Sequence, residues 1–116
     1  MVNVLIVDDN VARVREITAA ISADGVNIEY VTTKNEALCK LEGTEYDLAV
    51  IDIMLPENLS SLNPERTAGV ELIKDISKRK RVSPPREILG ITSDAETYTE
   101  SKKFFDERLI PILIWQ

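Results

Sequence analysis

Histidine is absent from this chain of 116 residues, and cysteine occurs once. Without histidine the chain lacks the base used in Ser-His and Cys-His catalysis and the commonest zinc ligand. The single cysteine, Cys39, excludes an internal disulfide and fits a reducing compartment, so we expect a cytoplasmic protein. Cys39 shares an expected helix with Leu38 and Leu41, and we predict that it belongs to the core rather than acting as a nucleophile.

Clustered glycines and long apolar runs are also missing. The four glycines lie apart, so the chain has no glycine-rich loop of the kind that binds nucleotide phosphates. No apolar run reaches the length of a membrane span, and the first residues lack the basic flank of a signal peptide. The formal net charge of −6 argues against nucleic acid as a partner, and the basic run at 78–81 is typical of a solvated helix end. We therefore expect neither nucleic acid nor membrane binding by this domain.

The sequence does contain a regular alternation of strand-like and helix-like segments. Apolar, β-rich runs predict strands at residues 2–7, 26–31, 48–51, 87–91 and 109–115. Helical spacing and capping residues predict helices that begin after Asn10, Thr33 and Ser93, and another that follows Ala68. The alternation predicts one α/β domain over residues 1–116, with parallel crossovers and helices on both faces of the sheet.

Polar residues end three of these strands: Asp8 and Asp9, then Asp52, then Thr92. In a sheet of this kind the ligand site lies beyond the carboxyl ends of the strands. Each residue has a plainer explanation alone, as a helix cap, a turn residue or a strand end. Together, three carboxylates at one edge would repel each other unless a cation such as Mg²⁺ neutralised them. Their joint occurrence therefore favours a Mg²⁺ site with an aspartate able to attack phosphorus.

Four segments of the chain resemble response-regulator receiver domains. Residues 4–10 (VLIVDDN) are similar to the opening of that family, and residues 48–56 (LAVIDIMLP) to its phosphoacceptor segment. Residues 69–73 (GVELI) resemble the start of its third helix, and residues 89–93 (LGITS) its fourth strand with a switch hydroxyl. The resemblance implies a flavodoxin-like, doubly wound, five-stranded parallel sheet in the order 2-1-3-4-5.

The resemblance also implies a role for each polar residue. Asp52 would accept a phosphoryl group, and Thr92 would bind one of its oxygens. Mg²⁺ would be held by Asp52, directly by Asp9, through water by Asp8 and by the backbone carbonyl of Met54. The domain would be a signalling switch rather than an enzyme, with a histidine kinase or phosphotransfer protein as partner and an output domain beyond residue 116. A haloacid-dehalogenase-like phosphatase would need a second aspartate where Met54 stands.

The fifth strand departs from the family pattern. The lysine expected at its end falls on Ile114 in the ungapped register, or on Ile110 if Pro111 matches the family's proline. Lys102 and Lys103 belong to the expected fourth helix and do not substitute. In the ungapped register Pro111 also stands where the family often has an aromatic switch residue. Loss of the cation should weaken phosphoryl stabilisation, so a degenerate receiver that acts by protein contact alone is the alternative function.

Two further departures concern length. The segment at residues 57–68 is longer than the family norm, and its polar composition predicts a solvated loop. The chain ends directly after the fifth strand, so the final helix of the family is absent from this chain. Without that helix the apolar residues around Trp115 lack part of their cover, and an exposed apolar patch of this kind marks an interface. The missing cover comes either from residues beyond this chain, which would then be a fragment of a longer protein, or from a second chain. Of the two we expect self-association.

Overall fold

The computed structural model describes residues 1–56 and 68–115. One five-stranded parallel sheet, in the order β2-β1-β3-β4-β5, organises these residues. The strands are β1 (Val2–Val7), β2 (Val26–Val31), β3 (Leu48–Asp52), β4 (Glu87–Thr92) and β5 (Ile112–Ile114), and the helices are α1 (Val11–Ile21), α2 (Lys34–Gly43), α3 (Ala68–Lys78) and α4 (Ala95–Glu107). The predicted flavodoxin-like fold class and strand order are confirmed.

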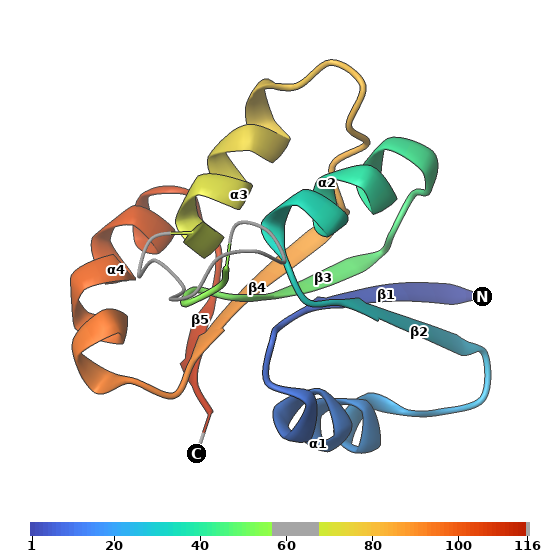
Figure 1. The fold of residues 1–116 in the computed structure, drawn as a ribbon, viewed down its shortest axis with the longest axis horizontal. Helices are drawn as coiled ribbons and strands as arrows, with labels where there is room; N and C mark the ends of the chain where they lie inside the picture. The colour runs from blue at the N-terminus through green and yellow to red at the C-terminus, as the bar shows by residue number, and fades with distance from the viewer. Residues whose placement is uncertain (57–67, 116) are drawn as a thin grey trace.

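Helices cover the two faces of the sheet unequally (Figure 1). α2, α3 and α4 pack on one face, whereas α1 packs on the other. β1 serves both layers because successive side chains of a strand point to opposite faces. Leu5 and Val7 join the core beneath α2, α3 and α4, and Val4 and Ile6 join the core beneath α1. The sheet is therefore buried in the middle, and its polar groups gather at its ends.

A glycine in the middle of β4 holds α4 close to the sheet. The ring of Phe105 is fully buried, and a Cβ atom at position 90 would overlap that ring. Glycine inside a strand often marks such a close approach. Gly90 thus allows Phe105 to pack directly on β4, which fixes α4 behind the strand that ends at Thr92.

The fifth strand is shorter than the sequence predicted. Arg108 and Leu109 donate backbone hydrogen bonds to Phe105 and Asp106, so the chain turns sharply at the end of α4. Leu109 has a φ of 57°, is 91% exposed and stands outside any strand. Because this left-handed conformation cannot continue a strand, pairing with β4 begins only at Ile112. The prediction of a strand over residues 109–115 was right in place and wrong in length.

Two other local predictions are wrong. α4 is capped by Asp94 rather than Ser93, since the Asp94 carboxylate accepts the backbone N–H of Thr97 at 3.1 Å. Cys39 is exposed, because α2 buries the helix face that carries Leu38 and leaves the next residue in solvent. The expected solvated loop at residues 57–68 lies outside the described residues, apart from Ala68, which is buried at the start of α3. In the described parts of the chain, no helix combines the length and apolar character needed to cross a membrane.

Candidate functional site

The carboxyl ends of β1 and β3 bring three aspartates to one edge of the sheet. The pairing of these strands places Val7 beside Ile51, so the residues that follow each strand are neighbours. Asp8, Asp9 and Asp52 each offer a carboxylate oxygen, and these oxygens lie within 4.8 Å of one another. The structure therefore brings together the three acids that the sequence singled out. We call them the acidic cluster.

The members of the acidic cluster differ in exposure. Asp8 is fully buried and Asp52 is 1% exposed, whereas Asp9 faces solvent. The backbone N–H of Met54 donates to Oδ1 of Asp52 at 3.1 Å and fixes the orientation of that carboxylate. The contact described for Met54 is thus made by its amide, and the expected use of its carbonyl as a metal ligand stays a prediction.

Thr92 ends β4 at the same edge of the sheet. Its side chain is fully buried, and its Oγ1 accepts the backbone N–H of Asp94 at 3.2 Å. β4 pairs with β3 so that Ile91 stands beside Asp52, which puts Thr92 one residue further along the edge. The structure places the hydroxyl where the sequence expected it, and its role as a switch stays a prediction.

A buried arginine lies among the carboxylates. Arg13 donates from Nε to Oδ2 of Asp8 at 2.5 Å and from Nη2 to Oδ1 of Asp8 at 2.9 Å. Such a two-point pair is the strongest arrangement available to an arginine and a carboxylate. Nη2 also lies 2.9 Å from Oδ2 of Asp52, and Nη1 donates to Oγ of Ser93 at 3.2 Å. One guanidinium therefore connects two members of the acidic cluster with the start of the β4–α4 loop.

Arg13 was not among the predicted site residues, although the sequence holds a signal for it. Asn10 caps α1 by accepting the backbone N–H of Arg13 at 3.1 Å, which puts Arg13 in the first turn after the aspartates. Arg13 also stands four residues before Ile17, on the face of α1 that is buried. An arginine on the apolar stripe of a helix, one turn from two acids, predicts a buried ion pair.

Burial controls the charge of Asp52. Removal from solvent, followed by the negative charge of Asp8, raises the pKa of Asp52 to about 8. The charge of Arg13 and the amide of Met54 act in the opposite direction and do not cancel these effects. The hydrogen bond to Asp8 raises the pKa of Arg13, so the arginine stays charged. Arg13 is therefore charged, whereas Asp52 loses its proton less readily than an exposed aspartate does.

The residues of the acidic cluster suit Mg²⁺ by their chemistry. Carboxylate oxygens are the ligands that this hard cation prefers. Among the described residues, Oδ2 of Asp52 is buried without a hydrogen bond, because its contact with Arg13 is an ion pair without hydrogen-bond alignment. A buried oxygen of this kind is an open acceptor for a cation. Asp9 is exposed and available, whereas both oxygens of Asp8 already accept hydrogen bonds.

The end of β5 carries no lysine in the sequence. Its last residue is Ile114, and Trp115 follows. Lys102 and Lys103 lie on α4 and pair with acids one turn away, at 3.1 and 3.9 Å. The predicted position of both lysines on the fourth helix is confirmed, and their failure to substitute stays a prediction. Within the described chain, the cation that contacts the acidic cluster is Arg13 of α1.

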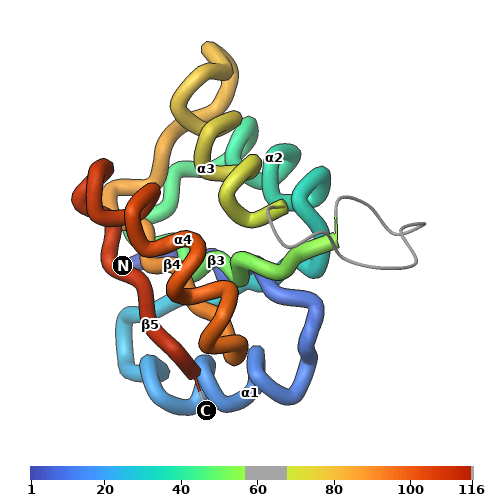
Figure 2. Tube along the Cα trace, turned by 90° about the vertical axis from the view of Figure 1, so that its left-hand side faces the viewer, coloured from blue at the N-terminus to red at the C-terminus, as the bar shows by residue number. Residues whose placement is uncertain are grey.

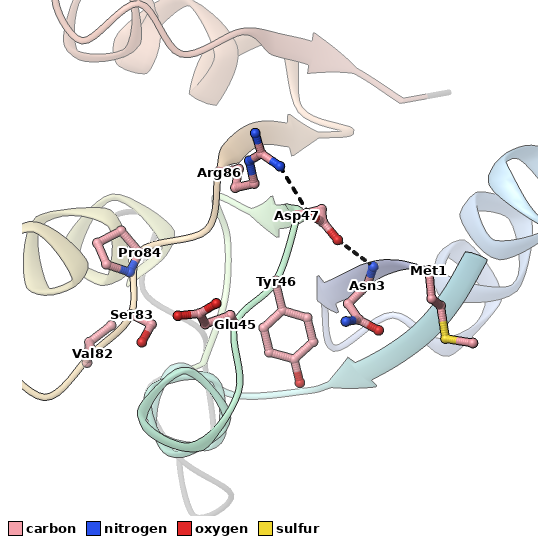
Figure 3. A pocket seen from close by; sticks show the side chains of 9 residues that line it. All are labelled: Met1, Asn3, Glu45, Tyr46, Asp47, Val82, Ser83, Pro84 and Arg86. Atoms are coloured by element: carbon pink, nitrogen blue, oxygen red, sulfur yellow. Dashed lines mark hydrogen bonds and ion pairs between the residues drawn. The ribbon is translucent and has the colours of Figure 1, made fainter. Parts of the chain in front are cut away.

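A second hollow, of about 650 Å³, opens at the other end of the sheet (Figure 3). Its polar groups contact one another: Asp47 accepts the backbone N–H of Asn3 at 2.8 Å, and Arg86 lies 3.9 Å from the same carboxylate. Tyr46, which lines this hollow, donates its hydroxyl to Glu29 at 2.7 Å. Because these groups already have partners, the acidic cluster is the better candidate site.

A model of the response regulator receiver domain matches residues 4–106. This chain belongs to the receiver domain family. It is 34% identical over 108 residues to the uncharacterized protein y4jS of Sinorhizobium fredii, covering 90% of this chain and 26% of that protein. It is 31% identical over 111 residues to the transcriptional regulatory protein TrcR of Mycobacterium tuberculosis, covering 94% of this chain and 42% of TrcR. The chain thus spans less than half the length of these relatives.

Solved receiver structures have the same fold. A CheY-like receiver domain protein from Methanospirillum hungatei superposes with a TM-score of 0.65 at 26% identity, over 89% of this chain and 74% of the other. The response regulator TrrA of Thermotoga maritima, in complex with Mg²⁺-BeF, gives a TM-score of 0.72 at 20% identity, over 100% of this chain and 88% of TrrA. Family membership makes this chain a signalling domain of the two-component type, and receiver domains bind Mg²⁺ at an acidic pocket.

Proposed function

We propose that Asp52 accepts a phosphoryl group from a histidine kinase or phosphotransfer protein, in a Mg²⁺-dependent reaction that makes the domain a signalling switch. One observation carries this proposal: the three carboxylates expected of a phosphoacceptor site meet at one edge of the sheet, within 4.8 Å of one another. The proposal places the domain in the cytoplasm. An output domain beyond residue 116 would receive the signal.

Each residue of the site has a task in this proposal. An oxygen of Asp52 forms a bond to phosphorus while the bond between phosphorus and the leaving group of the donor breaks. Mg²⁺, held by Asp52, Asp9 and the Met54 carbonyl and through water by Asp8, would shield the negative charges of carboxylate and phosphoryl group. The amide of Met54 keeps Asp52 oriented through its bond to Oδ1. The Thr92 hydroxyl accepts the Asp94 amide and would donate its own proton to a phosphoryl oxygen.

The alternative is a degenerate receiver that acts by protein contact without phosphorylation. Two observations favour it. The lysine of the family pattern is missing from the end of the fifth strand, where Ile114 and Trp115 stand. The guanidinium of Arg13 also contacts the acids that would bind metal and phosphoryl group. The complete set of three carboxylates favours the phosphoacceptor.

Labelling with a small phosphodonor separates the two functions. Acetyl phosphate and Mg²⁺ are added to the wild type, to Asp52→Asn and to Asp24→Asn, and each protein is weighed intact by mass spectrometry. Asp24 is the matched control because it is an exposed aspartate outside the acidic cluster. We expect slow gain of one phosphoryl group by the wild type and Asp24→Asn, and none by Asp52→Asn. Equal labelling of all three would exclude Asp52, and an unlabelled wild type would favour the degenerate receiver.

We also propose that the chain self-associates through β5. This strand is an edge of the sheet, and its Leu113 and Ile114 are 47% and 38% exposed. An edge strand with exposed apolar side chains is a pairing surface. Light scattering across micromolar concentrations should show a species larger than the monomer, and Leu113→Lys should reduce it. A monomer at every concentration, with Trp115 fluorescence unchanged on dilution, would contradict this proposal.

A further inference from the structure

We propose that Arg13 is an internal counter-ion that must leave Asp52 before a divalent cation binds, and that the released guanidinium moves toward Glu16 beside Trp115. The inference rests on the proposed function, since it takes Asp9 and Asp52 to be ligands of Mg²⁺. It assigns Arg13 as a positioning residue. Occupancy of the acidic cluster is thereby communicated to the end of β5.

The guanidinium of Arg13 occupies the place where a metal ion would bind. Nη2 of Arg13 lies 2.9 Å from Oδ1 of Asp8 and 2.9 Å from Oδ2 of Asp52, so it sits between two carboxylates of the acidic cluster. A divalent cation bound to the same oxygens would meet a positive charge at contact distance in a buried site, where repulsion is strong. The ion and the Arg13–Asp52 contact therefore exclude each other.

Arg13 is bound more firmly to Asp8 than to Asp52. Its two bonds to Asp8 form a buried pair, and only one contact reaches Asp52. That contact lacks hydrogen-bond alignment, because Oδ2 of Asp52 receives no hydrogen bond from any described residue. Breaking the Asp52 contact alone therefore costs less free energy than removing Arg13 from Asp8. The side chain can turn away from Asp52 while its helix stays in place.

The released guanidinium has a place to move to. A hollow of about 220 Å³ adjoins Arg13 and is lined by Glu16, Ser93 and Trp115 among others. Nη1 already reaches this side, since it donates to Oγ of Ser93. Glu16 stands three residues after Arg13 on α1, a spacing at which an arginine and a glutamate meet on a helix surface. The hollow thus offers the released guanidinium both space and a carboxylate.

Trp115 would report the movement of Arg13. The indole N–H of Trp115 donates to Oε2 of Glu16 at 2.9 Å. This bond joins the end of β5 to α1, and the traces of these two segments lie beside each other in Figure 2. A guanidinium that arrives at Glu16 competes for the same carboxylate and changes the surroundings of the indole. Trp115 is the single tryptophan of the chain, so its fluorescence reports this one event. Movement of Arg13 would therefore connect the acidic cluster to the end of β5, where the lysine of the family pattern is missing.

Titration with MgCl₂ tests the inference, with calorimetry for affinity and Trp115 fluorescence for the movement. The proteins are the wild type, Arg13→Gln, Arg13→Lys, Glu16→Gln and Arg15→Gln. Arg15 is the matched control, because it lies on the same helix, carries the same charge and is exposed. We expect Arg13→Gln to bind Mg²⁺ at least about tenfold more tightly than the wild type, as loss of a charge-assisted competitor implies. Arg15→Gln should bind as the wild type does.

The other variants separate folding from competition. Arg13→Lys keeps a buried positive charge but loses the two-point pair, so its affinity should lie between those of the wild type and Arg13→Gln. Glu16→Gln keeps an acceptor for the Trp115 indole and removes the charge that attracts Arg13. This variant should bind Mg²⁺ more weakly than the wild type, because the released guanidinium loses its partner, and should show a reduced fluorescence response.

Each remaining outcome identifies which idea fails. Equal or weaker Mg²⁺ binding by Arg13→Gln would overturn the inference and leave the proposed function standing, since the metal is still bound. Mg²⁺ binding by the wild type with no change in Trp115 fluorescence would overturn the movement toward Glu16. No Mg²⁺ binding by any of the proteins would overturn the proposed function itself, and the inference with it.

Discussion

Gly69, near the start of α3, lies directly against the backbone of Asp52. A Cβ atom at position 69 would overlap the carbonyl oxygen of Asp52 and come within 2.7 Å of the Cα of Ile53. The N–H of Gly69 donates to the carbonyl of Ile53 at 3.0 Å, which holds the first turn of α3 in this place. The helix therefore supports the backbone of the proposed phosphoacceptor from behind, and only glycine fits there.

Replacement of Gly69 by alanine should damage both the fold and the site. The added methyl group meets backbone atoms, which cannot rotate away as a side chain can. We expect Gly69→Ala to lower the free energy of unfolding by about 1–3 kcal/mol, as overpacking does elsewhere. Displacement of Asp52 should also weaken Mg²⁺ binding. Urea unfolding and calorimetric titration measure the two effects.

Gly43→Ala is the matched control for this substitution. Gly43 is the last residue of α2, and a Cβ atom there would meet nothing within 4 Å. The same chemical change should therefore leave the free energy of unfolding unchanged, or raise it by up to about 1 kcal/mol as the unfolded chain loses freedom. If both variants lost the same stability, the contact between Gly69 and Asp52 would not be the cause.

The architecture could be predicted from the sequence because its signals are local. The apolar run that ends at Asp52 predicts a central buried strand, and the structure has that strand in the middle of the sheet. The length of the fifth strand could not be read in this way. Its start depends on the turn at Leu109, a conformation that an apolar run does not reveal.

The candidate site was only partly predictable. Asp8, Asp9 and Asp52 follow strands directly, so the rule for strand ends places them together. Arg13 stands on the buried face of α1, one turn after Asp8 and Asp9, and that position by itself indicates an ion pair. Its bond to Ser93, 80 residues away along the chain, depends on the tertiary fold and is not visible in the sequence. The predicted site therefore contained the three carboxylates and lacked Arg13.

Alanine at Asp9 and at Asp8 should have different consequences. Asp9 is exposed, so Asp9→Ala should weaken Mg²⁺ binding with little change in the free energy of unfolding. Asp8→Ala removes the two-point partner of the buried Arg13. Breaking a buried pair costs about 3–5 kcal/mol, and we expect the lower end because Asp52 still contacts the guanidinium. Calorimetric titration with MgCl₂ and urea unfolding of both variants measure the difference.

The two variants should differ in which property they lose more, stability or Mg²⁺ affinity. Asp8→Ala should be the less stable protein, and Asp9→Ala the weaker metal binder. An Asp9→Ala variant with wild-type affinity for Mg²⁺ would remove Asp9 from the ligand set. An Asp8→Ala variant as stable as the wild type would show that the pair with Arg13 contributes little to the fold.

Asp52 should also give the metal-free protein a distinctive dependence on pH. Its carboxyl has an ordinary pKa of 3.8, which burial and the charge of Asp8 raise to about 8 in the folded state. Between these values the folded protein keeps a proton that the unfolded chain releases. The contribution of Asp52 to stability is therefore fully present below the unfolded pKa and is lost as the pH rises through the folded pKa. In this window the free energy of unfolding should fall by about 1.4 kcal/mol per pH unit on account of Asp52.

Urea unfolding in EDTA between about pH 5 and pH 8 tests this dependence, with Asp52→Asn as the comparison. The asparagine side chain does not titrate and resembles the protonated carboxyl. The free energy of unfolding of Asp52→Asn should therefore lack the fall with pH that Asp52 causes in the wild type. Mg²⁺ should oppose the fall in the wild type, because a metal ion favours the ionised carboxylate and stabilises the protein more as the pH rises. Equal pH dependence of the wild type and Asp52→Asn in EDTA would show that burial does not hold a proton on Asp52 at neutral pH.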